Sequence, residues 1–366
     1  MAERNPFTPA FGTVPSILAG RTQLLDEMAQ AFLNGPGDPN LSSILVGARG
    51  TGKTVCLSCI CEQAEQEGWI SVSTSAIPGM LEDIYEQTLM AGREFLPTQQ
   101  RRQLTSVSAG PASASWESVA ADRCNWRTRM SALLDNLAER EVGLLVTVDE
   151  ADPSLDEMVT LATVYQHFIR EQRGVALVMA GLPSNVDALV SNKSVSFLRR
   201  AQRHKLGLIP TPDVYDAVRR TVESAGKTIQ DDALAECARA IDGFPYMLQL
   251  VGYRCWQAAN DTNAITLDDA QRGIAAAKQD FEEHVIASTY RELSGVDIKF
   301  LSAMTVDKGE SRLAEVARRM GVTSSYASKY RARLCAAGVI EEVARGVVRF
   351  SIPGFREYVL KQEADR

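Results

Sequence analysis

Residues 47–54, with the sequence GARGTGKT, match the phosphate-loop pattern G-x-x-x-x-G-K-[ST] at every position. The largely apolar run 41–46 precedes them and a helical apolar pattern follows from Val55, so strand, glycine-rich turn and helix start occur in the required order. In such a turn consecutive backbone N–H groups point inward, and the helix N-terminus adds its positive dipole end. We therefore expect Lys53 to reach the β- and γ-phosphates of a nucleoside triphosphate and the Thr54 hydroxyl to bind Mg²⁺. The residues expected around the phosphates are Gly47, Ala48, Arg49, Gly50, Thr51, Gly52, Lys53, Thr54 and Val55.

A second apolar run, at residues 144–148, ends in the acids Asp149 and Glu150. We expect a buried strand there, with Asp149 ordering the Mg²⁺ shell and Glu150 polarising the attacking water. Acids at a strand end also occur for solubility alone, but the preceding phosphate loop favours an ATPase site. Residues 149–152 spell DEAD, a helicase signature; no other helicase motif accompanies it, and we interpret the match as a coincidence.

The chain has 366 residues, of which 45% are apolar and 23% charged, and this suits two or three globular domains of about 100–200 residues each. The N-terminus has no apolar core of a signal peptide, and no run approaches the roughly 18 apolar residues of a membrane span. These features predict a soluble cytoplasmic protein without a membrane partner.

Seven cysteines, an odd number, predict reduced thiols rather than disulfides in such a protein. Cys56, Cys59 and Cys61 are near enough in sequence to be considered as metal ligands, but no second Cys/His pair follows at finger spacing. We expect small buried thiols at these positions.

The first 210 residues alternate apolar strands with amphipathic helices, which is typical of an α/β core with a parallel sheet. The predicted strands are residues 44–46, 69–73, 144–148, 175–180 and 205–209, and the predicted helices are 54–66, 79–95, 124–140 and 155–172. Residues 97–118, rich in Ser, Ala, Gln and Arg around a Gly-Pro pair, predict a flexible insertion.

From residue 211 to 293 the strands stop and helical periodicity dominates. The predicted helices are residues 213–225, 231–242, 246–259 and 267–293, and Asp231 is expected to cap the second. A small helical domain behind an α/β core is a natural lid for a nucleotide cleft.

Residues 294–366 change character again. Helices predicted at 297–304, 312–320 and 324–337, followed by strands at 339–342 and 347–352, have the order of a winged helix-turn-helix. Residues 297–361 hold twelve Lys/Arg and seven Asp/Glu, a balance of +5, whereas the remainder of the chain carries −12. This asymmetry predicts that the C-terminal part meets a polyanion.

The third of these C-terminal helices has cations and hydroxyls but no acid. Such residues on one exposed face suit phosphate and base-edge contacts in the major groove of double-stranded DNA, and two wing arginines would reach the flanking backbone. The predicted DNA contacts are Ser324, Ser325, Tyr326, Ser328, Lys329, Arg331, Arg333, Arg345 and Arg349. Winged helices also bind proteins, so a protein partner remains an alternative.

Residues 14–21, VPSILAGR, resemble the entry motif of AAA+ ATPases. Together with the phosphate loop and the acidic pair, residues 12–260 resemble the branch that holds the origin-recognition-complex-like proteins, the archaeal initiators and their bacterial relatives. The resemblance implies an α/β P-loop NTPase core with a helical lid and a C-terminal winged helix-turn-helix. It also implies an adenine pocket at Val14, Pro15, Ile17 and Leu18, for which simple core packing is the alternative.

The resemblance further implies residues that sense the bound nucleotide. Sensor 1 lies just past the fourth strand, where Ser184 or Asn185 stands and the usual Thr-Asn ending is missing. In the lid, Pro245 is a candidate nucleotide contact and Arg254 a candidate sensor 2; a helix start set by proline is the alternative.

Arg199, Arg200 and Arg203 precede the last core strand, where the family commonly places a trans-acting arginine finger. A solvated basic helix face is the alternative, and the sequence does not single out one of the three. A finger acting in trans implies a homo-oligomer or a partner ATPase.

We therefore expect an ATP-binding and ATP-hydrolysing, Mg²⁺-dependent AAA+ switch that binds DNA through its winged helix. One alternative is a nucleotide-dependent signalling or transcription regulator whose winged helix contacts a protein. A small-molecule kinase is a third interpretation, in which the lid and the basic tail have no evident use.

Overall fold

The structure is a computed structural model that describes residues 4–10, 12–93, 95, 118–260 and 262–365. The predicted insertion at 97–118 lies outside these ranges except for its last residue. Within them, none of the helices combines the length and hydropathy that a bilayer-spanning segment requires.

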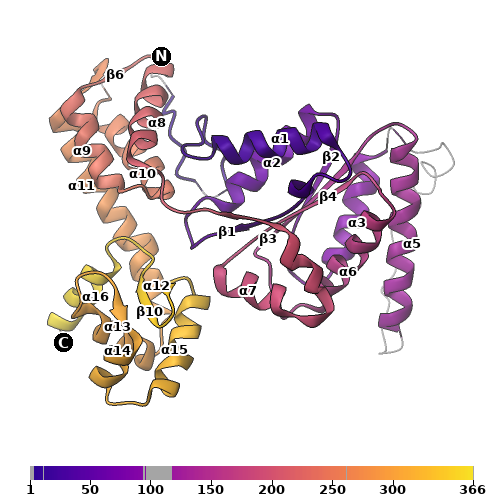
Figure 1. The fold of residues 1–366 in the computed structure, drawn as a ribbon. Coiled ribbons are helices and arrows are strands. Elements are labelled where there is room, and N and C mark those ends of the chain that lie inside the picture. The colour runs from indigo at the N-terminus through magenta and orange to yellow at the C-terminus, as the bar shows by residue number, and fades with distance from the viewer. Residues whose placement is uncertain (1–3, 11, 94, 96–117, 261, 366) are drawn as a thin grey trace, which may run out of the picture.

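A five-stranded parallel sheet, in the order β2-β3-β4-β1-β5, forms the centre of the N-terminal part (Figure 1). Its strands are β1 (Ser42–Val46), β2 (Ile70–Ser75), β3 (Leu144–Asp149), β4 (Val175–Gly181) and β5 (Gln202–Lys205). The central strands β3 and β4 are almost entirely buried, because helices cover both faces of the sheet. The predicted α/β fold class is confirmed.

The last strand of the sheet was predicted in the wrong place. Residues 205–209 were expected, whereas β5 has the polar sequence QRHK and pairs with β1 as an edge strand. Because an edge strand is exposed, apolar patterning did not reveal it.

Helices pack on both faces of the sheet and form two hydrophobic cores. Helices α1 and α2 bury one face through Met28 and Ile60, and α3, α5, α6 and α7 bury the other through residues such as Ile84 and Leu161. The helices of this part are α1 (Thr22–Asn34), α2 (Lys53–Gln66), α3 (Met80–Ala91), α5 (Ser118–Ala138), α6 (Asp156–Arg170) and α7 (Pro183–Ser191), with 3₁₀ segments η1 (Pro39–Leu41) and η2 (Lys193–Arg200).

Four helices follow, which we call the lid helices. They are α8 (Thr211–Ser224), α9 (Asp231–Ile241), α10 (Pro245–Ala258) and α11 (Leu267–Phe281), with the short strands β6 (Thr228–Ile229) and β7 (Ala264–Ile265) pairing between them. Asp231 is the first residue of α9 and Gln230 occupies the cap, so the predicted cap was wrong by one residue. The single helix predicted at 267–293 is interrupted by a π-helical turn, η3 (Glu282–Ile286), before α12 (Ala287–Arg291). Apolar periodicity does not mark such a turn.

The remaining elements, which we call the C-terminal unit, have the order expected of a winged helix-turn-helix. They are α13 (Gly295–Thr305), β8 (Ser311–Arg312), α14 (Leu313–Met320), α15 (Ser324–Ala336), β9 (Ile340–Ala344), β10 (Val347–Phe350) and α16 (Phe355–Ala364). Strands β8, β10 and β9 form an antiparallel sheet, of which β8 was not predicted.

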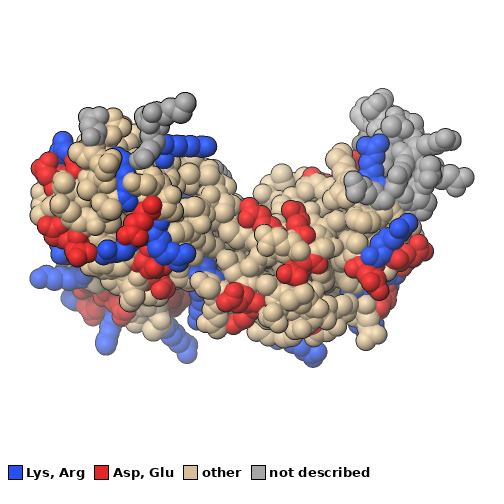
Figure 2. Space-filling model, turned by 90° about the horizontal axis from the view of Figure 1, so that it is seen from above, with Lys and Arg blue, Asp and Glu red and all other residues tan. Residues whose placement is uncertain are grey.

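The C-terminal unit and the lid helices share one hydrophobic core, to which Phe300 and Phe355 contribute on one side and Phe281 on the other. The unit lies below the lid helices, and α15 also packs against α7 of the sheet-containing part (Figure 1). Figure 2 shows the molecule from above, with a hollow between the lid helices on the left and the sheet-containing part on the right. On this face Lys and Arg are interspersed with Asp and Glu.

Candidate nucleotide-binding site

The phosphate loop begins where β1 ends and depends on its glycines. The Gly47 N–H donates to the Gly181 carbonyl at the end of β4, at 3.3 Å. A Cβ on Gly47 would lie 2.4 Å from Thr51 Oγ1 and 2.7 Å from the Leu206 carbonyl, so no other residue fits there. Gly52 caps α2 with a φ of 84°, which favours glycine. The loop therefore runs directly into the N-terminus of α2, as an anion-binding turn requires.

Lys53 holds its ammonium group over this loop. The side chain is 6% exposed, and Nζ donates to the carbonyls of Gly47 at 3.1 Å and Ala48 at 2.9 Å. Burial lowers the pKa of Lys53, while the charges of Glu150 and Asp149 act in the opposite direction. The cation thus stands between the loop and the acids at the end of β3.

The predicted acidic pair meets the loop across the carboxyl edge of the sheet. Thr54 Oγ1 donates to Asp149 Oδ2 at 2.5 Å, and Asp149 Oδ1 accepts the Glu150 N–H at 2.8 Å. Glu150 adopts a φ of 55°, a strained conformation for a residue other than glycine and one that is common at functional sites. The hydroxyl and carboxylate oxygens are the hard ligands that Mg²⁺ prefers, so the residues present fit that ion.

A cavity of about 710 Å³ opens beside the loop. Of the residues predicted to form an adenine pocket, Pro15, Ile17 and Leu18 line this cavity, whereas Val14 is not among the lining residues in the described part of the chain. The phosphate loop, Glu150, the start of α10 and the π-helical turn form the other walls, and the C-terminal unit contributes Ile352.

The lid helix α10 starts directly on the phosphate loop. A Cβ on Gly50 would lie 2.6 Å from the Phe244 ring, and one on Gly52 would lie 3.9 Å from Pro245. Phe244 in turn packs edge-on against Phe281, with ring centroids 5.9 Å apart. Pro245, a predicted nucleotide contact, lines the cavity beside the loop. Phe244, which precedes it in the sequence and also lines the cavity, was not among the predicted site residues.

Comparisons with known proteins agree with this geometry. Residues 17–178 match the AAA ATPase domain, and residues 283–359 match a domain of unknown function (DUF8462). The ORC2 protein of Aeropyrum pernix in its ADPNP–ADP complexes is 13% identical, with 98% of each chain covered and a TM-score of 0.60. This chain has an ORC-like AAA+ fold.

Two further solved structures share the AAA+ fold. The ADP form of Aeropyrum pernix ORC2 is 14% identical over 96% of each chain, with a TM-score of 0.52. Cdc6p of Pyrobaculum aerophilum is 16% identical over 97% of each chain, with a TM-score of 0.51. No curated protein matches the sequence. At these identities the similarity establishes the fold.

Arg21, the last residue of the AAA+ entry motif, is a buried anchor of the site. It is 8% exposed, and its Nη2 donates to the Gly207 carbonyl at 2.6 Å and to the Thr51 carbonyl at 3.5 Å. The guanidinium therefore ties the phosphate loop to the segment after β5. Arg21 belongs to the predicted entry motif, but this anchoring role was not predicted from the sequence. Beside it, burial raises the pKa of the Cys56 thiol to about 11, which suits the buried thiol expected there.

Among the described residues, the candidates for sensor 1 and sensor 2 do not line the cavity. Ser184 and Asn185 lie in the first turn of α7, and the Ser184 hydroxyl oxygen is buried with no hydrogen-bond partner among the described residues. Arg254 lies in the second half of α10, and its Nε donates to Asp280 at 2.6 Å. Within the described residues, neither Ser184 nor Arg254 lines the cavity.

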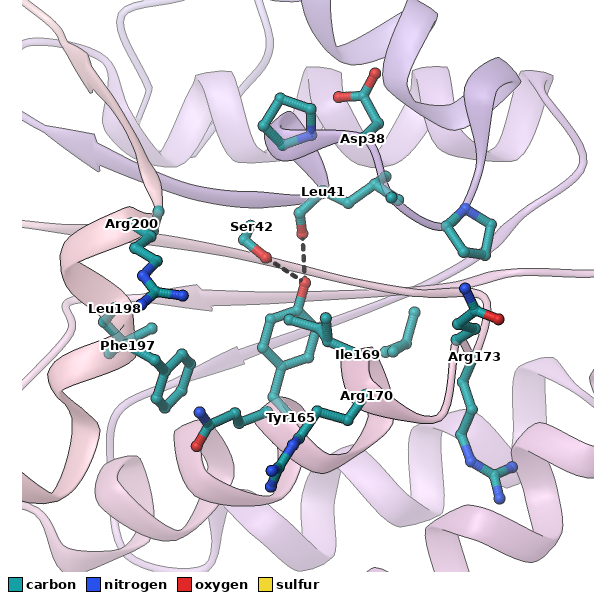
Figure 3. A pocket seen from close by; sticks show the side chains of 17 residues that line it. Asp38, Leu41, Ser42, Tyr165, Ile169, Arg170, Arg173, Phe197, Leu198 and Arg200 are labelled. Atoms are coloured by element: carbon teal, nitrogen blue, oxygen red, sulfur yellow. Dashed lines mark hydrogen bonds between the residues drawn. The ribbon is translucent and has the colours of Figure 1, made fainter.

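The arginine-finger candidates lie near the opposite edge of the sheet. Arg200 and Phe197, from η2, line a second cavity of about 560 Å³ with Tyr165 of α6, at the amino ends of β1 and β4 (Figure 3). Arg199 Nε donates to the Val190 carbonyl at 3.1 Å, and Arg203 is 3.7 Å from the Asp187 carboxylate. All three arginines are exposed.

Most of the predicted DNA-contacting cations of α15 and the wing have acidic partners. Arg331 binds Glu342 at 2.7 Å, Arg349 binds Glu341 at 2.5 Å, and Arg333 Nε binds Asp297 at 2.9 Å. Lys329 and Arg345 are exposed and have no ion pair within the described residues. Ser324, Ser325 and Tyr326 are exposed on the first turn of α15, and Ser328 Oγ donates to the Ser324 carbonyl at 2.8 Å. The free positive charge on this face is therefore smaller than the sequence indicated.

Proposed function

We propose that the chain binds and hydrolyses ATP in the cavity beside the phosphate loop. The observation that carries this proposal is the direct hydrogen bond between Thr54 and Asp149. Lys53 is held by carbonyls of the same loop, where the charges of Glu150 and Asp149 act on it. The loop N–H groups would hold the phosphates and Lys53 would offset their charge. Mg²⁺, held by Thr54 and Asp149, would supply further charge stabilisation at the phosphate oxygens. Glu150 would orient the attacking water and accept its proton.

Glu150→Gln tests this proposal. The amide keeps the shape of the side chain but cannot accept a proton, so phosphate release from ATP should fall by about 10²–10⁴-fold while ATP affinity is retained. Asp152→Asn is the matched control, because this acid lies in the same loop and its carboxylate accepts the Ser154 N–H at 2.8 Å. If the Glu150→Gln variant hydrolyses ATP at the unchanged rate, Glu150 does not activate the attacking water.

We also propose that Arg199 and Arg200 of η2 and Arg203 of β5 serve a neighbouring copy rather than their own site. Arg200 lies beside the amino end of β1 and the phosphate loop at the carboxyl end, and a strand of five residues spans about 16 Å. Mixing Glu150→Gln subunits with an Arg199→Ala, Arg200→Ala, Arg203→Ala triple variant should restore hydrolysis that neither has alone. A mixture as inactive as its components would contradict a finger acting in trans.

The C-terminal unit is proposed to bind double-stranded DNA through α15 and the wing. The exposed Lys329 and Arg345, with the hydroxyls of the first turn of α15, support this proposal. Affinity should fall steeply with salt, by roughly 10³-fold between 50 and 200 mM if about six phosphates are contacted. Affinity that stays flat across this range would favour the alternative, a regulator whose C-terminal unit binds a protein.

A further inference from the structure

The N-terminal segment is fixed to the lid helix α10 at the cavity. Phe7 is 2% exposed and packs so closely on Gly252 that a Cβ there would lie 2.3 Å from its ring. Asn5 Nδ2 donates to the Tyr253 carbonyl at 3.0 Å. Thr8 directly follows Phe7 in the sequence and lines the cavity. The contacts of Asn5 and Phe7 with α10 therefore hold Thr8 in place beside this helix.

Thr8 and Gln249 form a polar pair in the cavity wall. The Thr8 N–H donates to Gln249 Oε1 at 2.9 Å. Because a backbone N–H can only donate, the amide oxygen of Gln249 must face Thr8, which leaves its NH₂ group as a donor on the other side. The Thr8 hydroxyl oxygen is buried and has no hydrogen-bond partner among the described residues. A buried hydroxyl without a partner is unfavourable, and a ligand atom can supply the missing bond.

Gln249 lies in the cavity wall, further along α10 than the residue beside the phosphate loop. Pro245 lies beside the phosphate loop, and Gln249 follows four residues later, on the same face of α10 and about 6 Å further along its axis. Both residues line the cavity beside the phosphate loop. Phosphates at the loop would thus direct the sugar and base toward Gln249 and Thr8.

We propose that Thr8 and Gln249 read this base and select adenine over guanine, an inference that rests on the proposed nucleotide binding. The Watson–Crick edge of adenine offers an acceptor at N1 and a donor at the N6 amino group. The Gln249 NH₂ matches the N1 acceptor and the Thr8 hydroxyl can accept from N6. Guanine carries a hydrogen at N1 and is therefore a donor there. Two donors, guanine N1–H and the Gln249 NH₂ group, would then point at each other without forming a hydrogen bond. A site built on such bonds rejects a base that leaves its polar groups unpaired.

Gln249→Glu tests the pairing directly. A carboxylate still accepts the Thr8 N–H, but its second oxygen is an acceptor, which matches guanine N1–H and opposes adenine N1. ATP and GTP are titrated separately against a fluorescent ATP analogue bound to the full chain. The ratio of ATP to GTP affinity should fall by roughly tenfold or more, because each mismatched bond is worth about one decade.

Thr8→Val is the second variant, since it keeps the shape of the side chain and removes only the hydroxyl. It should lower ATP affinity several-fold and leave GTP affinity nearly unchanged. Gln257→Glu, an exposed position on the same helix, makes the same charge change outside the cavity and should leave the ratio unchanged.

The outcomes separate the two proposals. Failure of ATP and GTP alike to bind the unmodified chain would overturn the proposed function itself. Equal affinity for the two, or variants that shift both equally, would overturn base reading by Thr8 and Gln249 while nucleotide binding stands.

Discussion

The phosphate loop and helix α15 both concentrate positive charge, but they hold it in different ways. In the loop, neutral carbonyl groups of Gly47 and Ala48 hold the Lys53 ammonium, so its charge remains available to an anion. On α15, carboxylates hold Arg331 and Arg333, so an anion must compete with an existing ion pair. A cation held by neutral carbonyls keeps its charge available for an anion. A cation paired with a carboxylate contributes to the stability of the fold, and an anion must displace the carboxylate to bind it.

The largest expected effect lies in the loop, at Lys53→Ala. Removing the buried Lys53 ammonium above the loop should weaken ATP binding by roughly 100-fold or more, because hydrogen bonds to charged groups are the strong ones. Titration with a fluorescent ATP analogue measures this. Lys205→Ala, at the end of β5 on the same edge of the sheet, is the control and should bind ATP normally. If both variants lose ATP affinity to a similar extent, Lys53 does not bind the phosphates more strongly than another cation at this edge of the sheet.

The two regions also differ in how much of their structure the sequence predicts. The phosphate loop and the acids after β3 were predictable because the local backbone sets their geometry. The loop needs a strand, a glycine turn and a helix in sequence, and the acids need only the end of a second strand. Thr54 and Asp149 are therefore brought together as predicted.

The pairing of α15 could not be predicted in the same way. The helix has no acid of its own, but Asp297 from α13 and Glu342 from β9 reach its arginines across the tertiary fold. The net charge of residues 297–361 includes these acids, but it does not show that they lie against the arginines of α15. The same reason applies to Thr8, which is 241 residues from its partner Gln249.

The second prediction concerns Arg333→Ala, which should destabilise the fold rather than only weaken DNA binding. The Asp297 side chain is 5% exposed, and losing the guanidinium would leave it under-paired, at a loss of about 1–3 kcal/mol of unfolding free energy. Denaturant titration measures the loss. The exposed pair of Arg318 and Glu315 provides the control, since Arg318→Ala should change stability by less than about 1 kcal/mol.

The Arg333 effect should depend on pH. Burial acts to raise the pKa of Asp297, but hydrogen bonds from Arg333 and Ser294 outweigh it and leave the pKa below its usual range. A lowered carboxyl pKa in the folded state stabilises the fold fully above the unfolded value of about 4. That stabilisation is lost as the pH falls through the folded pKa, so the protein and the variant should converge in acid. A difference that persists unchanged at low pH would contradict this account.

The third prediction compares two cations on the proposed DNA surface. Lys329→Ala removes an exposed cation without an acidic partner in the described residues, and should reduce the slope of log affinity against log salt by about one. Arg331→Ala removes a cation already bound to Glu342, and should change the slope less. Filter binding to duplex DNA across a salt series measures both slopes. Equal slopes would show that the ion pair between Arg331 and Glu342 opens on binding, so that a carboxylate partner does not withhold the Arg331 charge from DNA.

The smallest expected effect tests whether the two regions touch. Gly338 ends α15 with a φ of 69°, and a Cβ there would lie 3.0 Å from Cγ of Arg49 in the phosphate loop. Gly321 ends α14 with the same φ of 69° and has no atom within 4 Å of such a Cβ. Alanine should therefore lose about 1 kcal/mol at either glycine through backbone strain, and up to about 1 kcal/mol more at Gly338 through crowding.

A double-mutant cycle isolates the crowding term, because Arg49→Ala removes the atoms that a Cβ on Gly338 would meet. In the Arg49→Ala background the two glycine variants should lose equal stability. If Gly338→Ala and Gly321→Ala already lose equal stability with Arg49 in place, the C-terminal unit does not rest on the loop in solution. If the excess at Gly338 disappears only when Arg49 is removed, the loop that would hold the phosphates and the helix that would meet DNA are in direct contact through one side chain.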